Sequence, residues 1–428
     1  MSTRRGKLIL RKECFGGIMA DTSTGRETFL RPGEYDSARI ELLSARRRGE
    51  RVLLFDASEL GFPLLADALS SPLSIYFELT KKCNGRCVQC FADSNSARWG
   101  ATELLFSEVE RVIREFSRLG GFYVRLTGGE PTTRGDFLDI LDVLNEEGIV
   151  AGLNTNGLFT ESMLHAILGR GVKDIRVSLD GPEEINDTIR GEGTYARIMR
   201  TLHGLAAYNK AASEPTDVTV NVVLMKSNQA RIEEMIELAA GLGFRVSFGL
   251  LRLIGRALPK EMLSPEEVVR AAHRVQMMRN RLGLPAGRAR VNYDIFCEED
   301  PPPRWVPPIL DNSQCHLSVS GLSVDAFGRI FPCGYMVGIE EWAGENVLGN
   351  DVLALWHNSV VLRKSRQTMR PGCTGCRYHV AKCNGGCPVM AYAVSGDVDG
   401  ADPYCVRGVR LRAGSDGRLL VGDQLNDT

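Results

Sequence analysis

The stretch Ser74–Cys90, SIYFELTKKCNGRCVQC, decides the fold, because a strand-like apolar run leads directly into three closely spaced cysteines. Ser74–Thr80 is a short apolar run typical of a buried strand. Cys83, Cys87 and Cys90 follow in the loop after it. The residues downstream of this stretch indicate which kind of sheet the strand belongs to.

Short apolar runs alternate with helical patterns from Leu73 to Gly283, which is typical of stacked βα units around a parallel sheet. We count six units and predict an α/β fold built on a partial (β/α)6 barrel of the TIM type. Functional residues of such a barrel gather at the C-terminal ends of its strands. The predicted strands are Ser74–Thr80, Tyr123–Thr127, Val150–Thr155, Asp174–Leu179, Val218–Met225 and Arg245–Leu251.

Charge and hydropathy exclude two classes of partner. The 428 residues carry 52 Lys and Arg against 53 Asp and Glu, a net charge of -1, which is far from the basic footprint of a nucleic-acid binder. Apolar stretches reach only about six residues, whereas a membrane-spanning helix needs about 20. We therefore expect a cytoplasmic protein that binds neither nucleic acid nor membrane.

Two smaller units flank the barrel. Residues 1–72 contain two strand patterns joined by a turn, followed by a helical stretch at Tyr35–Arg48. Residues 291–410 are rich in cysteine and proline, so metal ligands are expected to take the place of a hydrophobic core there. We divide the chain into a small module at 1–72, the barrel at 73–290, the cysteine-rich domain at 291–410 and a polar tail at 411–428.

Twelve cysteines in an intracellular chain of this size indicate metal rather than disulfides. Cys83, Cys87 and Cys90 share one loop at the functional end of the barrel. Three thiolates suit a four-iron cluster that leaves one iron open, whereas a structural zinc site normally has four protein ligands. A zinc site with a distant fourth ligand is the alternative.

The spacing Cys83-x3-Cys87-x2-Cys90, with Phe91 directly after it, resembles the signature of the radical S-adenosylmethionine (SAM) superfamily. The resemblance implies that these cysteines hold a catalytic [4Fe–4S] cluster whose open iron binds SAM. Cleavage of SAM by one electron then gives a 5′-deoxyadenosyl radical that abstracts a substrate hydrogen. The protein supplies binding, orientation and exclusion of water.

Motifs at successive strand ends match the same family and imply contacts with SAM. Gly128, Gly129 and Glu130 match the segment that meets the SAM amino group, because glycine lets the main chain approach closely and a carboxylate suits an ammonium. Ser178 resembles the ribose-contacting residue, and Arg190 resembles the arginine that meets the SAM carboxylate. The other positions matched are Asn154, Asn156, Asp180, Asn221 and the Gly255-Arg256 turn.

The remaining cysteines form a second pattern, Cys315-x12-Gly328-x4-Cys333, Cys373-x2-Cys376-x6-Cys383-x3-Cys387 and then Cys405. This pattern resembles a SPASM domain, which implies two auxiliary [4Fe–4S] clusters, although six residues instead of five separate Cys376 from Cys383. The resemblance assigns Cys373, Cys376, Cys383 and Cys405 to the outer cluster. It assigns Cys315, Cys333 and Cys387 to the inner cluster. A zinc ribbon is the alternative, but it leaves three of these cysteines unexplained.

Cys297 lies outside this pattern, where the chain leaves the barrel. Its acidic neighbours, Glu298 to Asp300, disfavour a reactive free thiolate, whereas iron binding deprotonates a thiol. Because some SPASM enzymes recruit an upstream cysteine, we expect Cys297 to complete the inner cluster. A buried apolar cysteine is the alternative.

The segment Leu10–Arg26 resembles the opening hairpin of a PqqD-like peptide-recognition element, which has a winged-helix fold. Such modules bind the leader of a precursor peptide as an added strand. We expect Phe15–Ala20 and Glu27–Leu30 to present the edge for that strand. A structural cap on the open barrel is the alternative.

These motifs together predict a radical SAM enzyme with a SPASM domain that oxidatively modifies a ribosomally synthesised precursor peptide (RiPP), for example by a crosslink. The implied partners are the precursor peptide and an electron donor such as flavodoxin or ferredoxin. A SPASM dehydrogenase of the sulfatase-maturase type, or one acting on a small molecule, is the alternative, and neither needs a leader-binding strand. A non-catalytic iron–sulfur carrier or zinc protein is disfavoured because it has no use for the strand-end motifs.

Overall fold

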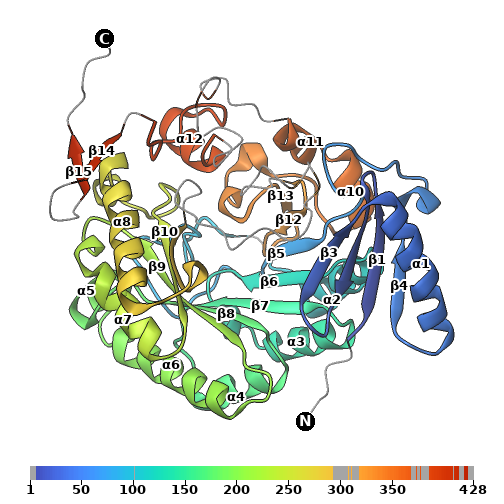
Figure 1. The fold of residues 1–428 in the computed structure, drawn as a ribbon, viewed down its shortest axis with the longest axis horizontal. Helices are drawn as coiled ribbons and strands as arrows, with labels where there is room; N and C mark the ends of the chain where they lie inside the picture. Colours follow the sequence, from blue (N-terminus) through green and yellow to red (C-terminus); the bar gives the residue numbers. More distant parts are fainter. Residues whose placement is uncertain are drawn as a thin grey trace.

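The computed structural model describes residues 6–100, 102–292, 307, 310, 318–367, 373, 376, 385–407, 409–413 and 419–422. Figure 1 shows an N-terminal sheet beside one long helix, a half-open barrel with helices on its outside, and C-terminal segments that lie over the barrel. None of the helices in these residues is long and apolar enough to cross a membrane.

The central sheet has nine strands in the order β11-β10-β9-β8-β7-β6-β5-β12-β13, and only the β12–β13 pair is antiparallel. Six of its strands confirm the predicted βα units, each within two residues of the expected ends. Their order follows the chain, as right-handed βα connections require. They are β5 (Ser74–Glu78), β6 (Tyr123–Thr127), β7 (Val150–Thr155), β8 (Asp174–Ser178), β9 (Asp217–Leu224) and β10 (Arg245–Leu250).

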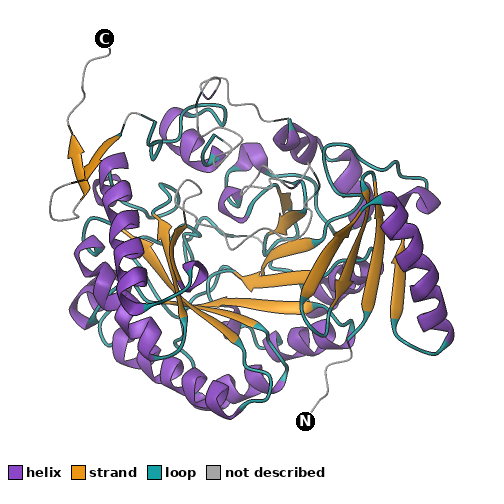
Figure 2. Ribbon diagram, in the orientation of Figure 1, coloured by secondary structure: helices purple, strands orange, loops and turns teal. Residues whose placement is uncertain are grey.

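Helices cover the convex face of this sheet, as Figure 2 shows. Alternate strand residues such as Phe77, Leu126 and Val177 pack against them in one large buried cluster. The partial (β/α)6 barrel is therefore confirmed, with its hydrophobic core between sheet and helices. The helices are α2 (Phe106–Arg118), α3 (Phe137–Glu146), α4 (Glu161–Gly169), α5 (Glu183–Arg190), α6 (Thr194–Ala211), α7 (Ile232–Gly241) and α8 (Pro265–Leu282).

The concave face of the sheet lines the barrel lumen with polar side chains. Because successive strand residues point to opposite faces, the residues between the core positions face inward. Tyr76, Arg125, Asn154, Arg176 and Thr219 occupy such positions on five neighbouring strands. The lumen is therefore suited to a polar ligand.

Three further strands extend the sheet beyond the six predicted ones. β11 (Ala289–Asn292) pairs with β10, so the barrel continues slightly past the expected boundary at residue 290. β12 (Gly321–Val324) pairs with β5 and carries the short β13 (Ile330–Phe331). A Cβ atom on Gly321 would lie 2.4 Å from Ser74 Oγ, so the glycine permits this approach. The C-terminal domain thus shares a sheet with the barrel.

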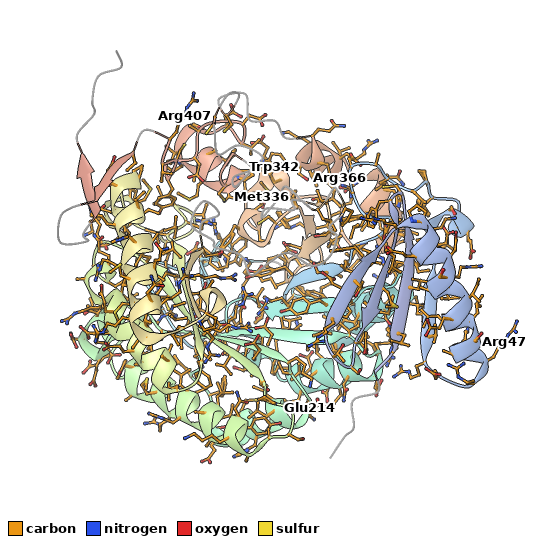
Figure 3. All side chains as sticks on the ribbon, viewed as in Figure 1. Arg47, Glu214, Met336, Trp342, Arg366 and Arg407 are labelled. Carbon is orange, nitrogen blue, oxygen red and sulfur yellow. The ribbon has the colours of Figure 1, made fainter. Side chains whose placement is uncertain are left out.

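The C-terminal domain also has a small hydrophobic core of its own, which the sequence did not indicate. Phe331, Met336, Trp342 and Val389 are buried together, and Figure 3 labels Met336 and Trp342 in this region. The helices around it are α10 (Val352–Asn358), α11 (Val360–Arg366) and α12 (Pro388–Ser395). The expectation that metal ligands replace the core is therefore corrected in part, because apolar packing contributes as well.

The N-terminal module is a four-stranded sheet in the order β3-β2-β1-β4 with one α-helix in residues 6–72. The expected hairpin is present, but β2 is paired on both sides, so only β3 of the two expected strands lies at the edge. The single helix differs from the helical bundle that a winged helix implies. The elements are β1 (Leu8–Glu13), β2 (Gly16–Asp21), β3 (Arg26–Leu30), α1 (Pro32–Arg47) and β4 (Val52–Phe55).

A fully buried ion pair joins this module to the barrel. Arg11 Nη2 lies 3.0 Å from Glu13 Oε1, and the Arg11 and Glu13 side chains are 0% and 2% exposed. Arg11 also donates to the carbonyl oxygen of Gly120 in the barrel at 3.4 Å and to that of Ser71 at 2.5 Å, while Glu13 accepts from the Ser70 N–H at 2.7 Å. The module is therefore docked through satisfied buried charges rather than through a flexible linker.

Residues 411–428, expected to form a polar tail, contain most of an antiparallel pair, β14 (Arg410–Ala413) with β15 (Leu419–Gly422). This part of the chain is therefore not a tail without secondary structure.

Candidate active site at the strand ends

The three cysteines of the first motif lie in the loop that follows β5. Cys83, Cys87 and Cys90 are free, partly exposed thiols. A Cβ atom on Gly85 would lie 3.8 Å from Cys83 Sγ and 3.9 Å from Cys87 Sγ, so both sulfurs face the same side of the loop. Glycine leaves that side open for a shared ligand.

Two N–H donors point at these sulfurs, one from the end of a strand and one from the end of a helix. Asn156, directly after β7, places Nδ2 3.7 Å from Cys83 Sγ. Arg190, the last residue of α5, places Nη1 3.7 Å from Cys87 Sγ. Because N–H groups directed at sulfur stabilise the negative charge of an iron–sulfur cluster, this donor set fits such a cluster.

Burial raises the pKa of the Cys83 thiol to about 11, and the nearby Cys87 and Cys90 thiols shift it in the same direction. Burial also raises the pKa of Cys87, against the opposing charge of Arg190. Among the described residues, no three His, Cys, Asp or Glu side chains are grouped to hold a single metal ion. Because burial raises their pKa, the Cys83 and Cys87 thiols are protonated near neutral pH in the metal-free protein, and iron binding has to release their protons.

Gly128 and Gly129 fasten the start of the cysteine loop to the end of β6. The Gly129 N–H donates to Thr80 O at 2.6 Å, and the Glu130 N–H donates to Lys82 O at 2.8 Å. A Cβ atom on Gly129 would lie 2.0 Å from Lys82 O, and Gly128 has a φ of +141°. Any side chain at either position would therefore displace the loop.

The Glu130 carboxylate faces the protein interior. It is fully buried and accepts hydrogen bonds from Asn156 N at 2.8 Å, Thr155 Oγ1 at 2.9 Å and Thr132 Oγ1 at 2.7 Å. Burial raises its pKa, and these donors oppose that shift. The carboxylate joins the ends of β6 and β7, and both of its oxygens accept hydrogen bonds from the protein.

Asp180 and Arg190 form a buried ion pair beside Cys87. Arg190 Nη2 lies 2.8 Å from Asp180 Oδ2, with side chains 8% and 0% exposed. Asp180 also accepts from Gln89 Nε2 at 2.5 Å and from Val223 N at 2.7 Å. Since Gln89 belongs to the cysteine loop and Val223 to β9, Asp180 fixes Arg190 between the two.

Ser178, Asn221 and Asn154 lie on the lumen side of the sheet. Ser178 and Asn221 are partly buried neighbours in the β8–β9 register. Asn154 donates to Tyr76 Oη at 3.1 Å and accepts from Arg125 Nη1 at 3.0 Å. Ser178 and Asn221 thus form a pair of polar groups near the strand ends, whereas Asn154 belongs to a network deeper in the lumen.

The Gly255-Arg256 turn clamps the cysteine loop from the opposite side. A Cβ atom on Gly255 would lie 2.4 Å from Cys90 O. Arg256 donates to Cys87 O at 3.2 Å and to Ser94 O at 2.7 Å. This turn therefore holds the loop backbone, which gives it a structural reason to occur at this position.

The described cysteines of the C-terminal domain are Cys333, Cys373, Cys376, Cys387 and Cys405, all free thiols. Burial raises the pKa of Cys333 to about 11, with Cys387 close enough to add to the shift. The Cys376 N–H donates to Cys373 O at 3.0 Å. Cys297, Cys315 and Cys383 lie outside the described residues, so the structure leaves their predicted roles untested.

Arg252, two residues after the end of β10, was not singled out from the sequence. Its charge lies near Cys387, whose negative form raises the pKa of the guanidinium against the effect of burial. Arg252 stacks over Tyr335 at 5.2 Å, and Tyr335 meets Phe91 edge-on at 5.1 Å. This chain of contacts joins the cysteine loop of the barrel to the C-terminal cysteines. In the sequence, only the position of Arg252 shortly after a predicted strand could have suggested a role for this residue.

Comparison with known proteins gives a consistent family. Residues 77–239 match the model of the Radical SAM superfamily. Mycofactocin maturase MftC of Mycobacterium tuberculosis is 29% identical, over 79% of this chain and 84% of its own. The AdoMet-dependent heme synthase of Methanosarcina barkeri is 30% identical, over 79% of this chain and 97% of its own. The PqqA peptide cyclase of Rhizobium meliloti is 28% identical, over 78% and 87% respectively.

The fold resembles that of SuiB from Streptococcus suis, solved with its precursor peptide SuiA. The TM-score is 0.68 at 17% identity, over 92% of this chain and 97% of that chain. The match leaves out 8% of this chain, which is about 34 residues. That is only about half as many residues as the range 6–72 contains. The likeness in fold therefore extends into the N-terminal module.

Proposed function

The chain belongs to the radical SAM superfamily, and on this premise we propose that it is an enzyme that cleaves SAM reductively and abstracts a hydrogen atom from a peptide. Family membership implies a [4Fe–4S] cluster and SAM as cofactors. The observation that carries the proposal is the loop of Cys83, Cys87 and Cys90, faced by the N–H donors of Asn156 and Arg190.

Cys83, Cys87 and Cys90 are the proposed ligands of the catalytic cluster. With SAM bound, that cluster supplies the electron that generates a 5′-deoxyadenosyl radical for hydrogen abstraction. The protein holds the loop rigid through Gly129 and Arg256, and it directs N–H groups at two of the sulfurs. The barrel would thereby place the radical next to one carbon atom of the substrate in every turnover.

The proposed SAM contacts lie around this loop. The main chain of Gly128–Glu130 would meet the amino group, and Ser178 with Asn221 would meet the ribose. Arg190 is the proposed partner of the SAM carboxylate because its guanidinium lies beside Cys87. Asp180 acts by positioning Arg190, and Asn156 by its hydrogen bond toward Cys83. Asn154 acts through its network with Tyr76.

Two auxiliary [4Fe–4S] clusters are proposed for the C-terminal domain. Cys373, Cys376, Cys383 and Cys405 would hold the outer cluster, and Cys297, Cys315, Cys333 and Cys387 the inner one. The positive charge of Arg252 near Cys333 and Cys387 supports an anionic centre there. These clusters would accept the electron released when the substrate radical is oxidised. A protein such as flavodoxin or ferredoxin would be the electron donor for the reductive cleavage of SAM.

A ribosomally synthesised precursor peptide is the proposed substrate class. PqqA peptide cyclase and MftC, a maturase, support a peptide substrate. The exposed strand β3 at the edge of the N-terminal sheet supports capture of a leader as an added strand, because its outer N–H and C=O groups have no neighbouring strand. Modification would then take place in the barrel while the module holds the leader.

The catalytic assignment is tested by the triple variant Cys83→Ala, Cys87→Ala, Cys90→Ala. Under dithionite it should form no 5′-deoxyadenosine while keeping the auxiliary iron, about two-thirds of the roughly 12 iron atoms expected for three four-iron clusters. Cys14→Ala is the matched control, since Cys14 is exposed and lies outside every cysteine group. If the triple variant still makes 5′-deoxyadenosine, the assignment is wrong. In the wild-type enzyme, stoichiometric zinc with about one-third of the 12 iron atoms would support a zinc ribbon instead.

Leader capture is tested by proline rather than by deletion, because the module shares a buried cluster with the barrel that includes Ile9, Leu73 and Phe122. Successive N–H groups of the edge strand β3 point alternately toward β2 and away from the sheet. Of Glu27→Pro and Thr28→Pro, one therefore removes an N–H that faces β2 and the other removes an N–H that faces outward. The substitution on the free side should abolish binding of the full-length precursor and spare uncoupled SAM cleavage. Unchanged affinity in both variants would favour the structural cap.

A small-molecule substrate is the second candidate, and the heme synthase relative is the observation in its favour. The two candidates differ in their need for a leader. Conversion of a leaderless small substrate at rates unaffected by proline in β3 would support this alternative over peptide modification.

A further inference from the structure

The lumen of the barrel carries more positive than negative charge below the proposed ribose contacts. Arg176 lies two residues before Ser178 on β8. Arg290 on β11 continues the register row that runs from Ser178 through Asn221 and Ser247. Both arginines therefore face the same space as the proposed SAM contacts. Arg290 lies in the same register row as Ser178, and Arg176 lies two residues before Ser178 along the strand.

The acidic group nearest to these arginines is already engaged. Asp174 accepts from Tyr123 Oη at 3.0 Å and contacts the guanidinium of Arg125, which is 7% exposed. Arg176 Nε lies 4.0 Å from the remaining oxygen, Asp174 Oδ1. Within the described part of the chain, Arg290 has neither a hydrogen bond nor an ion pair. Asp174 thus serves Arg125 and Arg176, and the charge of Arg290 has no carboxylate partner among the described residues.

A cavity of about 270 Å³ opens between these side chains, which is enough for an amino-acid side chain or a chain end. Burial and the like charges of Arg125 and Arg290 lower the pKa of Arg176, so the site destabilises its own cation. An anion in the cavity would relieve that repulsion. The cavity is lined by Asp174, Arg176, Thr219, Arg245, Ser247 and Arg290, among others.

We propose that Arg176 and Arg290 bind a carboxylate of the substrate, with the hydroxyls of Thr219 and Ser247 as further donors. Planar guanidinium groups pair with carboxylates through two parallel N–H bonds, which fix orientation as well as position. The proposal rests on the proposed function, because it names the group by which the peptide is held in the lumen.

An anchor at this depth has a direct consequence for the reaction. Two residues along a strand span about 7 Å, so the carboxylate lies about that far below Ser178. The carbon atoms next to it then project upward, toward the end of the lumen where SAM is proposed to bind. The substrate carboxylate is either that of an acidic side chain or the C-terminal one, and both sources have the same chemistry.

The test uses the reconstituted holoenzyme with SAM and ligand-observed NMR titrations of three tripeptides. The first is acetyl-Ala-Ala-Ala with a free C-terminal carboxylate, the second is acetyl-Ala-Glu-Ala amide, and the third is the neutral acetyl-Ala-Gln-Ala amide. At least one carboxylate peptide should bind about tenfold or more tightly than the neutral peptide. The one that does so identifies the source. Equal affinities for all three would overturn the proposal.

Arg176→Gln and Arg290→Gln should each abolish the preference for the carboxylate peptide. Arg290 is exposed and unpaired among the described residues, so its substitution leaves the fold intact. Arg231→Gln is the matched control, because Arg231 is not part of the cavity lining and is paired with Glu234 at 2.6 Å. Loss of the preference in Arg231→Gln as well would show a general charge effect and overturn the assignment.

Failure of this inference is distinguishable from failure of the proposed function. Wild-type enzyme that forms 5′-deoxyadenosine but shows no carboxylate preference overturns the anchor alone. Enzyme with intact clusters that prefers carboxylates but forms no 5′-deoxyadenosine supports the anchor and overturns the radical reaction.

Discussion

Asp180→Asn should disturb the site from inside the barrel without touching a cysteine. Asp180 is fully buried and receives Arg190 Nη2, Gln89 Nε2 and Val223 N. An asparagine has one acceptor oxygen in place of two, and it leaves the Arg190 charge buried without a counter-ion. Removing one partner of a buried ion pair costs about 3–5 kcal/mol. Since about 1.4 kcal/mol is a factor of ten, local opening should increase by about two to three and a half orders of magnitude.

Hydrogen exchange measured by mass spectrometry reports this directly, because the Val223 N–H itself donates to Asp180. The β9 segment should exchange faster in Asp180→Asn, and 5′-deoxyadenosine formation under dithionite should fall at least tenfold as Arg190 loses its position. Glu184→Gln is the control, because Glu184 lies on α5, the helix that carries Arg190. Glu184 is exposed and pairs with Arg231 at 3.4 Å on the surface. Exchange and turnover within twofold of wild type in Asp180→Asn would refute the positioning role.

Three further predictions concern docking, thiol ionisation and helix capping. Arg11→Met should lower the free energy of unfolding, measured by urea titration, by about 3–5 kcal/mol. The double variant Arg11→Met, Glu13→Gln should recover part of this loss. If the single and the double variant lose equal free energy of unfolding, the two residues are not a coupled pair. In metal-free protein, the rate of alkylation of Cys83 should rise about tenfold per pH unit up to about pH 10, because burial raises the pKa of the thiol to about 11. Mass spectrometry measures this rate, and a plateau near pH 9 would exclude the shift. Ser264→Ala should cost about 0.5–2 kcal/mol by removing the cap on the Glu267 N–H, visible as faster exchange in the first turn of α8 and absent in Ser264→Thr.

The sequence by itself determined the barrel and its cysteine loop. Apolar runs and helical spacing are local signals, so all six strands could be placed within two residues of their observed ends. Ser264 with Glu267 likewise marks the start of α8, because a capping box is written in four consecutive residues. Cysteine spacing fixed the candidate ligands because the ligands of a cluster on one loop are close in sequence.

Only the tertiary structure decided how distant residues combine. The pairing of β12 with β5, the hydrogen bond from Arg11 to the Gly120 carbonyl and the approach of Arg252 to Cys387 join segments far apart in the chain. The orientation of Glu130 and the set of lumen arginines also depend on which face of the sheet each residue meets. Such contacts leave no local pattern, because register and packing between elements decide which side chains share a buried space.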